Sequence, residues 1–268
     1  MIKMIATDMD GTLLNSKKQL TQNSIRAIKA VKNMGIHFSV ASGRQYYNIY
    51  NVFKQHGLEK NVSFLAENGT IVFDKGKLIF ANKLGDNIVK ATVELARKTP
   101  HVYPVLCGVN SAYIEDNHPK IISEFNKYFD RRQFLSNVLQ CLKYDTITKI
   151  ALLDTTSNAE TYLYPIFKRF EKHYQVLVSG VEWVDLINKG VNKGTAVEMI
   201  GDLYNSSFEH RMAFGDYLND LALLKACKYS FSVANAHETL KKAAYKICPS
   251  NDDDGVAKTL IEWFNLKF

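Results

Sequence analysis

The chain has 268 residues, of which 46% are hydrophobic and 23% are charged, so it can bury a substantial core and is not expected to be disordered. The formal net charge is +7, but Lys and Arg are spread among Asp and Glu without a basic cluster that carries interleaved aromatic residues, so nucleic-acid binding is not predicted. No apolar stretch approaches a membrane span, and the start of the chain leads into a predicted strand instead of a signal peptide; we expect a cytoplasmic protein with no membrane partner.

The first third of the sequence alternates short apolar runs with amphipathic segments, which is typical of βα units. Strands are predicted at residues 2–6, 36–41 and 62–66, and helices from about residue 21 and over residues 45–56. Gly35 and Gly57 are the expected helix stops. Residues 70–74 and 77–81 are predicted to form a hairpin around the Asp74-Lys75-Gly76-Lys77 turn.

The βα pattern is interrupted after Leu84 by a mixed segment. Helices are predicted there at residues 87–98, 121–128 and 158–172, and strands at residues 111–115, 146–154, 174–179 and 183–187. From Lys193 the βα pattern resumes, with helices at 193–203, 218–227 and 237–245, strands at 211–214 and 229–233, and a last helix ending near residue 264. We therefore expect an α/β protein with a discontinuous core of residues 1–82 and 189–268 and an α+β insert of residues 83–188.

Two aspartates follow the first predicted strand. Side chains two residues apart along a strand point to the same side, so Asp8 and Asp10 are expected to converge where that strand ends. Open α/β sheets bind their ligands at the carboxyl ends of the strands. Because two close carboxylates repel each other unless a cation lies between them, the pair indicates a metal site, or a nucleophile beside a proton donor, or both.

Four motifs occur in an order that resembles the haloacid dehalogenase (HAD) superfamily. They are Asp8-Met9-Asp10-Gly11-Thr12, Ser42-Gly43-Arg44, Lys193-Gly194 and Gly215-Asp216-Tyr217-Leu218-Asn219-Asp220. Glu67-Asn68-Gly69, Asn235-Ala236 and Asp254-Gly255-Val256 are similar to the Cof-type, sugar-phosphatase-like branch. The resemblance covers essentially the whole chain. It implies a Rossmann-like parallel-sheet core with the larger type of cap domain, inserted after the third core strand and responsible for substrate specificity.

The resemblance also implies the chemistry of the site. Asp8 would attack phosphorus and become an aspartyl-phosphate, and Asp10 would be the general acid and later the base that activates water. The Asp8 carboxylate, the Asp10 main-chain carbonyl and the Asp216 carboxylate would hold Mg²⁺. Phosphate would be bound by the Ser42 hydroxyl, the Gly43 and Met9 backbone N–H groups, Lys193 and Asn219. Thr12, Arg44 and Asp220 would support the site, and Asp216 and Asp220 are expected to share one helical turn.

The function that these motifs imply is Mg²⁺-dependent hydrolysis of phosphomonoesters of small metabolites. Sugar phosphates are the leading substrate class, and nucleotides, FMN and pyridoxal phosphate remain open. A phosphomutase that uses the same site and a regulator that binds phosphoesters without turnover are the alternatives. Within the insert, Tyr113, Glu115, Glu182 and Asp185 are candidate contacts to the leaving group. The four cysteines (Cys107, Cys141, Cys227 and Cys248) show no metal-ligand spacing and are interpreted as reduced core thiols.

Overall fold

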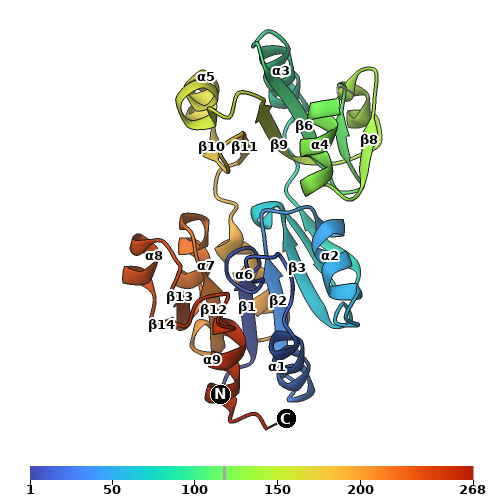
Figure 1. The fold of residues 1–268 in the computed structure, drawn as a ribbon. Helices are drawn as coiled ribbons and strands as arrows, with labels where there is room; N and C mark the ends of the chain where they lie inside the picture. The colour runs from blue at the N-terminus through green and yellow to red at the C-terminus, as the bar shows by residue number, and fades with distance from the viewer. Residues whose placement is uncertain (117–118, 268) are drawn as a thin grey trace. The chain divides into compact units, whose positions relative to one another are not determined.

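The structure is a computed structural model that describes residues 1–116 and 119–267. The chain forms two compact units: Met1–Ile79 together with Asn192–Phe268, and Phe80–Val191. In Figure 1 the first unit is coloured blue to cyan and orange to red, and the second is mainly green to yellow. From the sequence we expect the chain to leave the core after residue 82 and to return at residue 189.

One sheet of eight strands organises the first unit, in the order β14-β13-β12-β1-β2-β3-β4-β5. The strands are β1 (Met4–Asp8), β2 (His37–Ala41), β3 (Val62–Ala66), β4 (Ile71–Asp74), β5 (Lys77–Ala81), β12 (Arg211–Gly215), β13 (Tyr229–Val233) and β14 (Lys246–Cys248). Neighbouring strands from β14 to β3 are parallel, whereas β4 runs antiparallel to β3. β1 pairs with β2 on one side and β12 on the other, so strand order reverses at β1. The carboxyl ends of β1 and β12 therefore flank a topological switch point, where open α/β sheets generally bind ligands.

Helices cover this sheet, and every residue of β1, β2, β3 and β12 is therefore buried. The helices are α1 (Gln22–Asn33), α2 (Tyr46–Lys54), α6 (Lys193–Leu203), α7 (Leu221–Lys225), α8 (Glu238–Ala243) and α9 (Gly255–Phe264). α1 shows how sequence sets these elements: the Thr21 hydroxyl accepts the Ser24 N–H at its start, and Ile25, Ile28 and Val31 form its buried stripe. α1 packs against α9, and α6 packs against α7.

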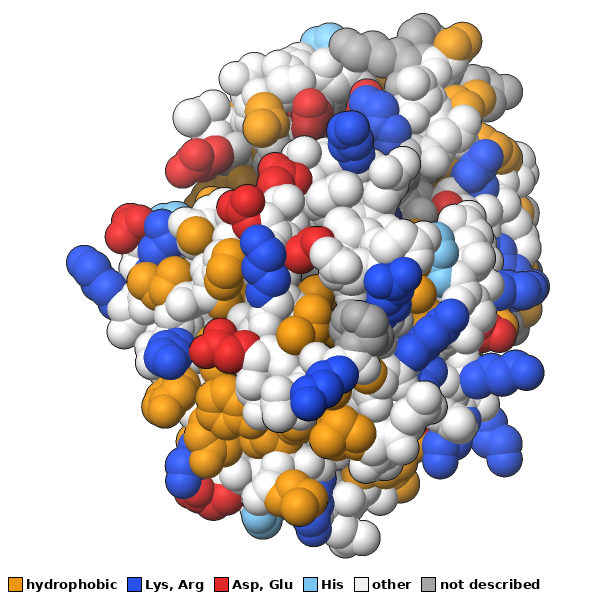
Figure 2. All heavy atoms as spheres, turned by 60° about the horizontal axis from the view of Figure 1, so that its bottom comes forward, with side chains coloured by type: hydrophobic (Ala, Val, Ile, Leu, Met, Phe, Trp, Pro, Cys, Tyr) orange, Lys and Arg blue, Asp and Glu red, His pale blue; other side chains and the backbone are white. Residues whose placement is uncertain are grey.

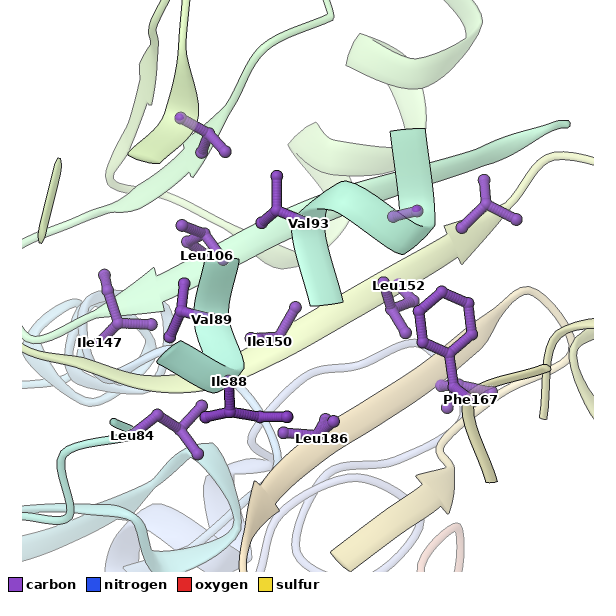
Figure 3. Close-up of a cluster of buried hydrophobic side chains, with 14 of the residues drawn as sticks. Leu84, Ile88, Val89, Val93, Leu106, Ile147, Ile150, Leu152, Phe167 and Leu186 are labelled. Carbon is purple, nitrogen blue, oxygen red and sulfur yellow. The ribbon is translucent and has the colours of Figure 1, made fainter. Parts of the chain in front are cut away.

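The second unit is built on a six-stranded sheet of order β10-β11-β9-β6-β7-β8. Its elements are α3 (Asp86–Arg97), β6 (Val102–Gly108), β7 (Ala112–Ile114), α4 (Pro119–Tyr128), β8 (Arg132–Phe134), β9 (Ile147–Asp154), α5 (Tyr164–Phe167), β10 (Tyr174–Val178) and β11 (Trp183–Asn188). Figure 3 shows Val89 and Val93 of α3 lying over Leu106 of β6 and Ile150 of β9, which gives this unit a hydrophobic core of its own. The predicted α/β class with a parallel-sheet core and an α+β insert is confirmed.

The prediction of one helix over residues 158–172 is wrong. The segment contains a π-helical turn (Ala159–Leu163), the four-residue α5 and a 3-10 turn (Lys168–Lys172). Pro165 lacks the N–H that would bond to the carbonyl of Thr161 in a continuous α-helix, so the helical register changes there.

Strand β6 was missed because Pro104 interrupts its apolar pattern. β9 pairs with β6 along its length, but β7 pairs only with Leu106 and Cys107. Among the described strands, Pro104 therefore has only β9 beside it. Because β7 does not reach Pro104, the missing N–H removes no bond between β6 and β7. The short strands β8 and β14 were also missed, since three residues carry too little periodicity to be recognised.

The surface and the helices bear on possible large partners. Figure 2 shows one face on which Lys and Arg side chains are scattered among other side chains, with Asp and Glu between some of them. Among the described residues, no helix combines the length and the hydrophobicity needed to cross a membrane.

Candidate active site

A buried lysine joins two carboxylates at the carboxyl edge of the core sheet. Asp8 is the last residue of β1, and Lys193 is the first residue of α6, which begins with a capping box between Asn192 and Thr195. The Lys193 Nζ donates to Asp8 Oδ1 and to Asp220 Oδ1, each at 2.6 Å. Lys193 is 1% exposed and Asp220 is 0% exposed, so these charges interact with little solvent screening.

Negative charge exceeds positive charge in this cluster. Burial and then the neighbouring Asp220 raise the pKa of Asp8 well above its ordinary value, although Lys193 opposes the shift. Burial followed by Asp220 raises the pKa of Asp216 to about 6. Burial lowers the pKa of Lys193, but the two carboxylates outweigh it and hold the pKa above its ordinary value. A second cation would relieve the repulsion that remains among the carboxylates.

The acidic residues fit a divalent metal ion. Asp8, Asp216 and Asp220 each offer a carboxylate oxygen, and these oxygens lie within 4.8 Å of one another. Asp8 Oδ2 is buried and has no hydrogen-bond partner among the described residues. Carboxylate oxygens are the hard ligands that Mg²⁺ prefers. The Asp10 carboxylate is outside this group of described acids, and the contribution of its main-chain carbonyl stays a prediction.

The loop after β12 is folded around Asp216. Asp220 Oδ2 accepts the backbone N–H groups of Asp216 and Tyr217, and the Thr12 hydroxyl donates to Asp216 Oδ1 at 3.3 Å. Gly11 has φ +77°, and a Cβ there would lie 2.3 Å from Asp216 Oδ2, so another residue would strain the backbone and displace the Asp216 carboxylate. The expectation that Asp216 and Asp220 share a helical turn is wrong. Asp216 precedes the 3-10 turn Leu218–Asp220, and the Asp220 side chain folds back to hold it.

Asp10 faces a different set of partners from Asp8. Arg44 donates from Nε to Asp10 Oδ2 and from Nη2 to Oδ1, both at 2.6 Å, and Lys18 Nζ donates to Oδ1 at 2.7 Å. Burial raises the pKa of Asp10, but hydrogen bonds and charge from Arg44 and then Lys18 bring the pKa below its ordinary value. The predicted convergence of Asp8 and Asp10 assumed that strand alternation continues to Asp10, but β1 ends at Asp8. Arg44, which the resemblance predicted to support the site, thus binds Asp10. Arg44 also donates from Nη1 to Asn48 Oδ1.

Several of the groups predicted to bind phosphate contact neighbouring residues of the site. Ser42 is 2% exposed, and its hydroxyl accepts the Arg44 backbone N–H. Asn219 donates its amide to Asn68 Oδ1 at 3.3 Å, and the same oxygen lies 3.2 Å from the position of a Cβ on Gly43. Met9 is fully buried.

Sequence reasoning assigned no role to several residues that touch the site. They are Lys18, which pairs with Asp10, Asn48, which supports Arg44, Asn68, which accepts from Asn219, and Asn235, whose amide donates to the Gly11 carbonyl. Asn68 and Asn235 lie in segments that the resemblance had marked, so their positions carried a signal. Lys18 and Asn48 carried none, because a lysine in a loop and an asparagine on a helix are common on surfaces.

The candidate contacts in the insert are bound within their own unit. Tyr113 is fully buried and donates its hydroxyl to Asp145 Oδ2 at 2.8 Å, so its prediction as a substrate contact is wrong. Glu115 accepts from Arg97 and from the Val138 N–H. Asp185 forms a buried ion pair with Lys149, with 3.3 Å between Oδ2 and Nζ, and Glu182 Oε1 accepts from the Ser157 hydroxyl at 3.5 Å.

Comparison with known families assigns the chain. Residues 5–260 match the family of haloacid dehalogenase-like hydrolases. The chain belongs to this family. The predicted superfamily and the predicted class of enzyme, a hydrolase of the HAD type, are thereby confirmed.

Named relatives and solved structures agree over nearly the whole length. The 5-amino-6-(5-phospho-D-ribitylamino)uracil phosphatase YbjI of Escherichia coli is 30% identical, covering 95% of this chain and 93% of its own. The phosphatase YitU of Bacillus subtilis, which carries the same substrate name, is 26% identical over 98% of both chains. The solved structure of a haloacid dehalogenase-like hydrolase from Bacteroides thetaiotaomicron has the same fold, with a TM-score of 0.87. It is 24% identical, and the match covers 98% of this chain and 100% of that one.

The buried lysine gives a test of this arrangement. Lys193→Met should lower the free energy of unfolding at pH 7 by about 3 kcal/mol or more, because Asp8 and Asp220 would keep buried charges without their shared cation. Urea denaturation followed by circular dichroism measures the loss. Lys228→Met, which removes an exposed ion pair with Glu209, is the matched control and should cost much less. Equal losses in the two variants would contradict the assignment.

Proposed function

We propose that this chain is a Mg²⁺-dependent phosphatase that hydrolyses phosphomonoesters of small metabolites through an aspartyl-phosphate on Asp8. The observation that carries the proposal is the state of the Asp8 carboxylate. Lys193 holds its Oδ1, whereas its Oδ2 is buried without a hydrogen-bond partner among the described residues. The Asp8 carboxylate also belongs to the acidic group that it forms with Asp216 and Asp220. One oriented and one unengaged oxygen is the arrangement that a carboxylate nucleophile requires.

The reaction divides into two displacements. In the first, an Asp8 oxygen forms a bond to phosphorus, the bond from phosphorus to the leaving oxygen breaks, and Asp10 gives that oxygen a proton. In the second, Asp10 takes a proton from water, the water oxygen attacks phosphorus, and the Asp8 carboxylate leaves with inorganic phosphate as product. Asp10 is held as a carboxylate by Arg44 and Lys18, so it must take up a proton and loosen these contacts before it can act as the acid.

The remaining groups would neutralise or bind the negative charge of the phosphate. Asp8, Asp216 and the Asp10 carbonyl would hold Mg²⁺, which when bound neutralises phosphate charge. Lys193 would keep the nucleophile oriented and reduce its repulsion of the phosphate. The Ser42 hydroxyl, the Gly43 and Met9 N–H groups and the Asn219 amide would bind the phosphate oxygens.

The names of two relatives support a proposal for the substrate class. Both named phosphatases act, by name, on a pyrimidine that carries a phosphorylated ribityl chain. Such a chain and a sugar phosphate share a phosphate on a polyhydroxylated carbon skeleton, so we propose this class as the substrate. We further propose that the inserted unit, predicted as residues 83–188, sets the preference among leaving groups.

The nucleophile is tested by Asp8→Asn. The amide is a poor nucleophile, so hydrolysis of p-nitrophenyl phosphate should fall by roughly 10⁴-fold or more, with the circular dichroism spectrum unchanged. Asp202→Asn alters a carboxylate whose side chain is 85% exposed, and it should keep wild-type activity. Wild-type turnover by the Asp8 variant would eliminate the proposal.

Dependence on the metal has a readout besides activity. EDTA should abolish turnover and Mg²⁺ should restore it. Without substrate, Mg²⁺ should raise the midpoint of thermal unfolding of the wild-type protein, because a ligand that binds only the folded state stabilises it. Asp216→Asn should lose most of this shift, since it removes one oxygen of the acidic group. Full activity in EDTA would rule out the metal requirement.

The substrate class is tested by a panel of sugar phosphates, ribityl phosphates, nucleotides, FMN and pyridoxal phosphate. We expect the highest kcat/KM for phosphates on polyhydroxylated chains. Inorganic phosphate and isomeric hexose phosphates are both measured, because a phosphomutase would form isomers without net release of phosphate. A clear preference for nucleotides would overturn the substrate proposal and leave the nucleophile assignment standing.

A further inference from the structure

A left-handed turn follows strand β3, on the same side of the core sheet as the candidate site. Glu67, Asn68 and Gly69 are consecutive and have φ values of +49°, +58° and +91°. Two of them carry side chains, for which this backbone conformation costs free energy. Such a conformation persists only where the surroundings fix it, and it concentrates at functional sites.

The backbone of this turn is tied to the loop that follows β2. The Asn68 N–H donates to the Ser42 carbonyl at 2.9 Å, and the Glu67 N–H donates to the Arg44 carbonyl at 3.0 Å. These bonds run to the residues on both sides of Gly43. The turn therefore fixes the loop whose Ser42 hydroxyl and Gly43 N–H are proposed to bind phosphate.

The Asn68 side chain reaches a second segment. Its Oδ1 accepts the Asn219 amide at 3.3 Å, and the same oxygen lies 3.2 Å from the position of a Cβ on Gly43. Asn68 is 8% exposed, so this contact is largely shielded from water. One carbonyl oxygen thus lies close to both the loop after β2 and the loop after β12.

Gly69 brings the turn against a third segment. A Cβ on Gly69 would lie 2.5 Å from the carbonyl oxygen of Asn192, which is the N-cap of α6. Lys193 is the next residue. The Glu67–Gly69 turn therefore contacts all three segments that supply the predicted phosphate-binding side chains Ser42, Asn219 and Lys193.

We propose that Asn68 is a positioning residue for the phosphate group. Its side chain accepts the Asn219 amide and lies against Gly43, and it acts through these groups without contacting the reacting atoms. The sequence supplies asparagine because this residue tolerates left-handed φ and carries a carbonyl acceptor. The proposal rests on the proposed function and deepens it by assigning this residue to phosphate binding.

Asn68→Gly separates the side chain from the backbone. Glycine accepts the left-handed conformation, so the variant loses the Asn219 contact without added backbone strain. We expect KM for p-nitrophenyl phosphate and the inhibition constant of inorganic phosphate to rise by roughly 10-fold, with kcat changed less. Asn61→Gly replaces an exposed asparagine at φ +56° and should leave both constants unchanged. Unchanged constants in Asn68→Gly would overturn the proposal.

A double-mutant cycle with Asn219→Ala tests the route of action. If Asn68 acts through the Asn219 amide, the double variant should bind phosphate no more weakly than the weaker single variant, whereas additive losses would overturn this assignment. Phosphate binding is also measured by calorimetry, which requires no turnover. If the wild-type protein binds phosphate but hydrolyses no phosphomonoester, the proposed function is defeated. If Asn68→Gly then weakens phosphate binding, the positioning role is still supported. Absence of phosphate binding by the wild-type protein would defeat both.

Discussion

The ammonium group of Lys193 lies between two carboxylates that the chain could not otherwise bury together. Asp8 and Asp220 come from β1 and from the turn after β12, and Lys193 comes from the first residue of α6. Each of these charges is costly to bury alone, and the two carboxylates are tolerated because both accept a hydrogen bond from Lys193. The constraint is mutual: three distant segments must meet at atomic precision, and the core sheet is the scaffold that brings them together.

The topology of that sheet explains why the segments meet where they do. β1 and β12 are adjacent, although the whole second unit lies between them in the chain. Strand order reverses at β1, so the loops after β1 and β12 leave the sheet at the switch point instead of covering one another. Gly11 then allows the Asp216 carboxylate to approach the loop after β1 to a distance at which a Cβ would displace it.

Polar side chains around this centre divide into two networks. The first holds Asp8, Asp216 and Asp220 close enough for a shared cation. The second holds Asp10 with Arg44 and Lys18, and Arg44 in turn with Asn48. Separation of the two aspartates gives them different electrostatic surroundings: the pKa of Asp8 is raised by burial and the pKa of Asp10 is lowered by its cations. Different environments for neighbouring carboxylates allow one to serve as nucleophile and the other in proton transfer.

Local sequence determined the elements and the family. The bounds of β3, β13 and α6 agree with the predictions, because apolar periodicity and caps act between neighbouring residues. The resemblance of the motifs also predicted Asp8, Lys193 and Asp216 as site residues, and the structure brings these side chains together. Pro104 and Pro165 limited the prediction of the insert, since the effect of a proline depends on whether its missing N–H faces a partner.

Only the tertiary structure decided which side chains meet. The partners of Asp10, the fold-back of Asp220 onto the Asp216 N–H and the contact of Asn68 with Asn219 join residues through space. Sequence periodicity describes one strand or one helix at a time, and it ends where the chain turns. Catalytic loops lie at such turns, so their hydrogen bonds depend on how separate segments pack, which a local pattern does not encode.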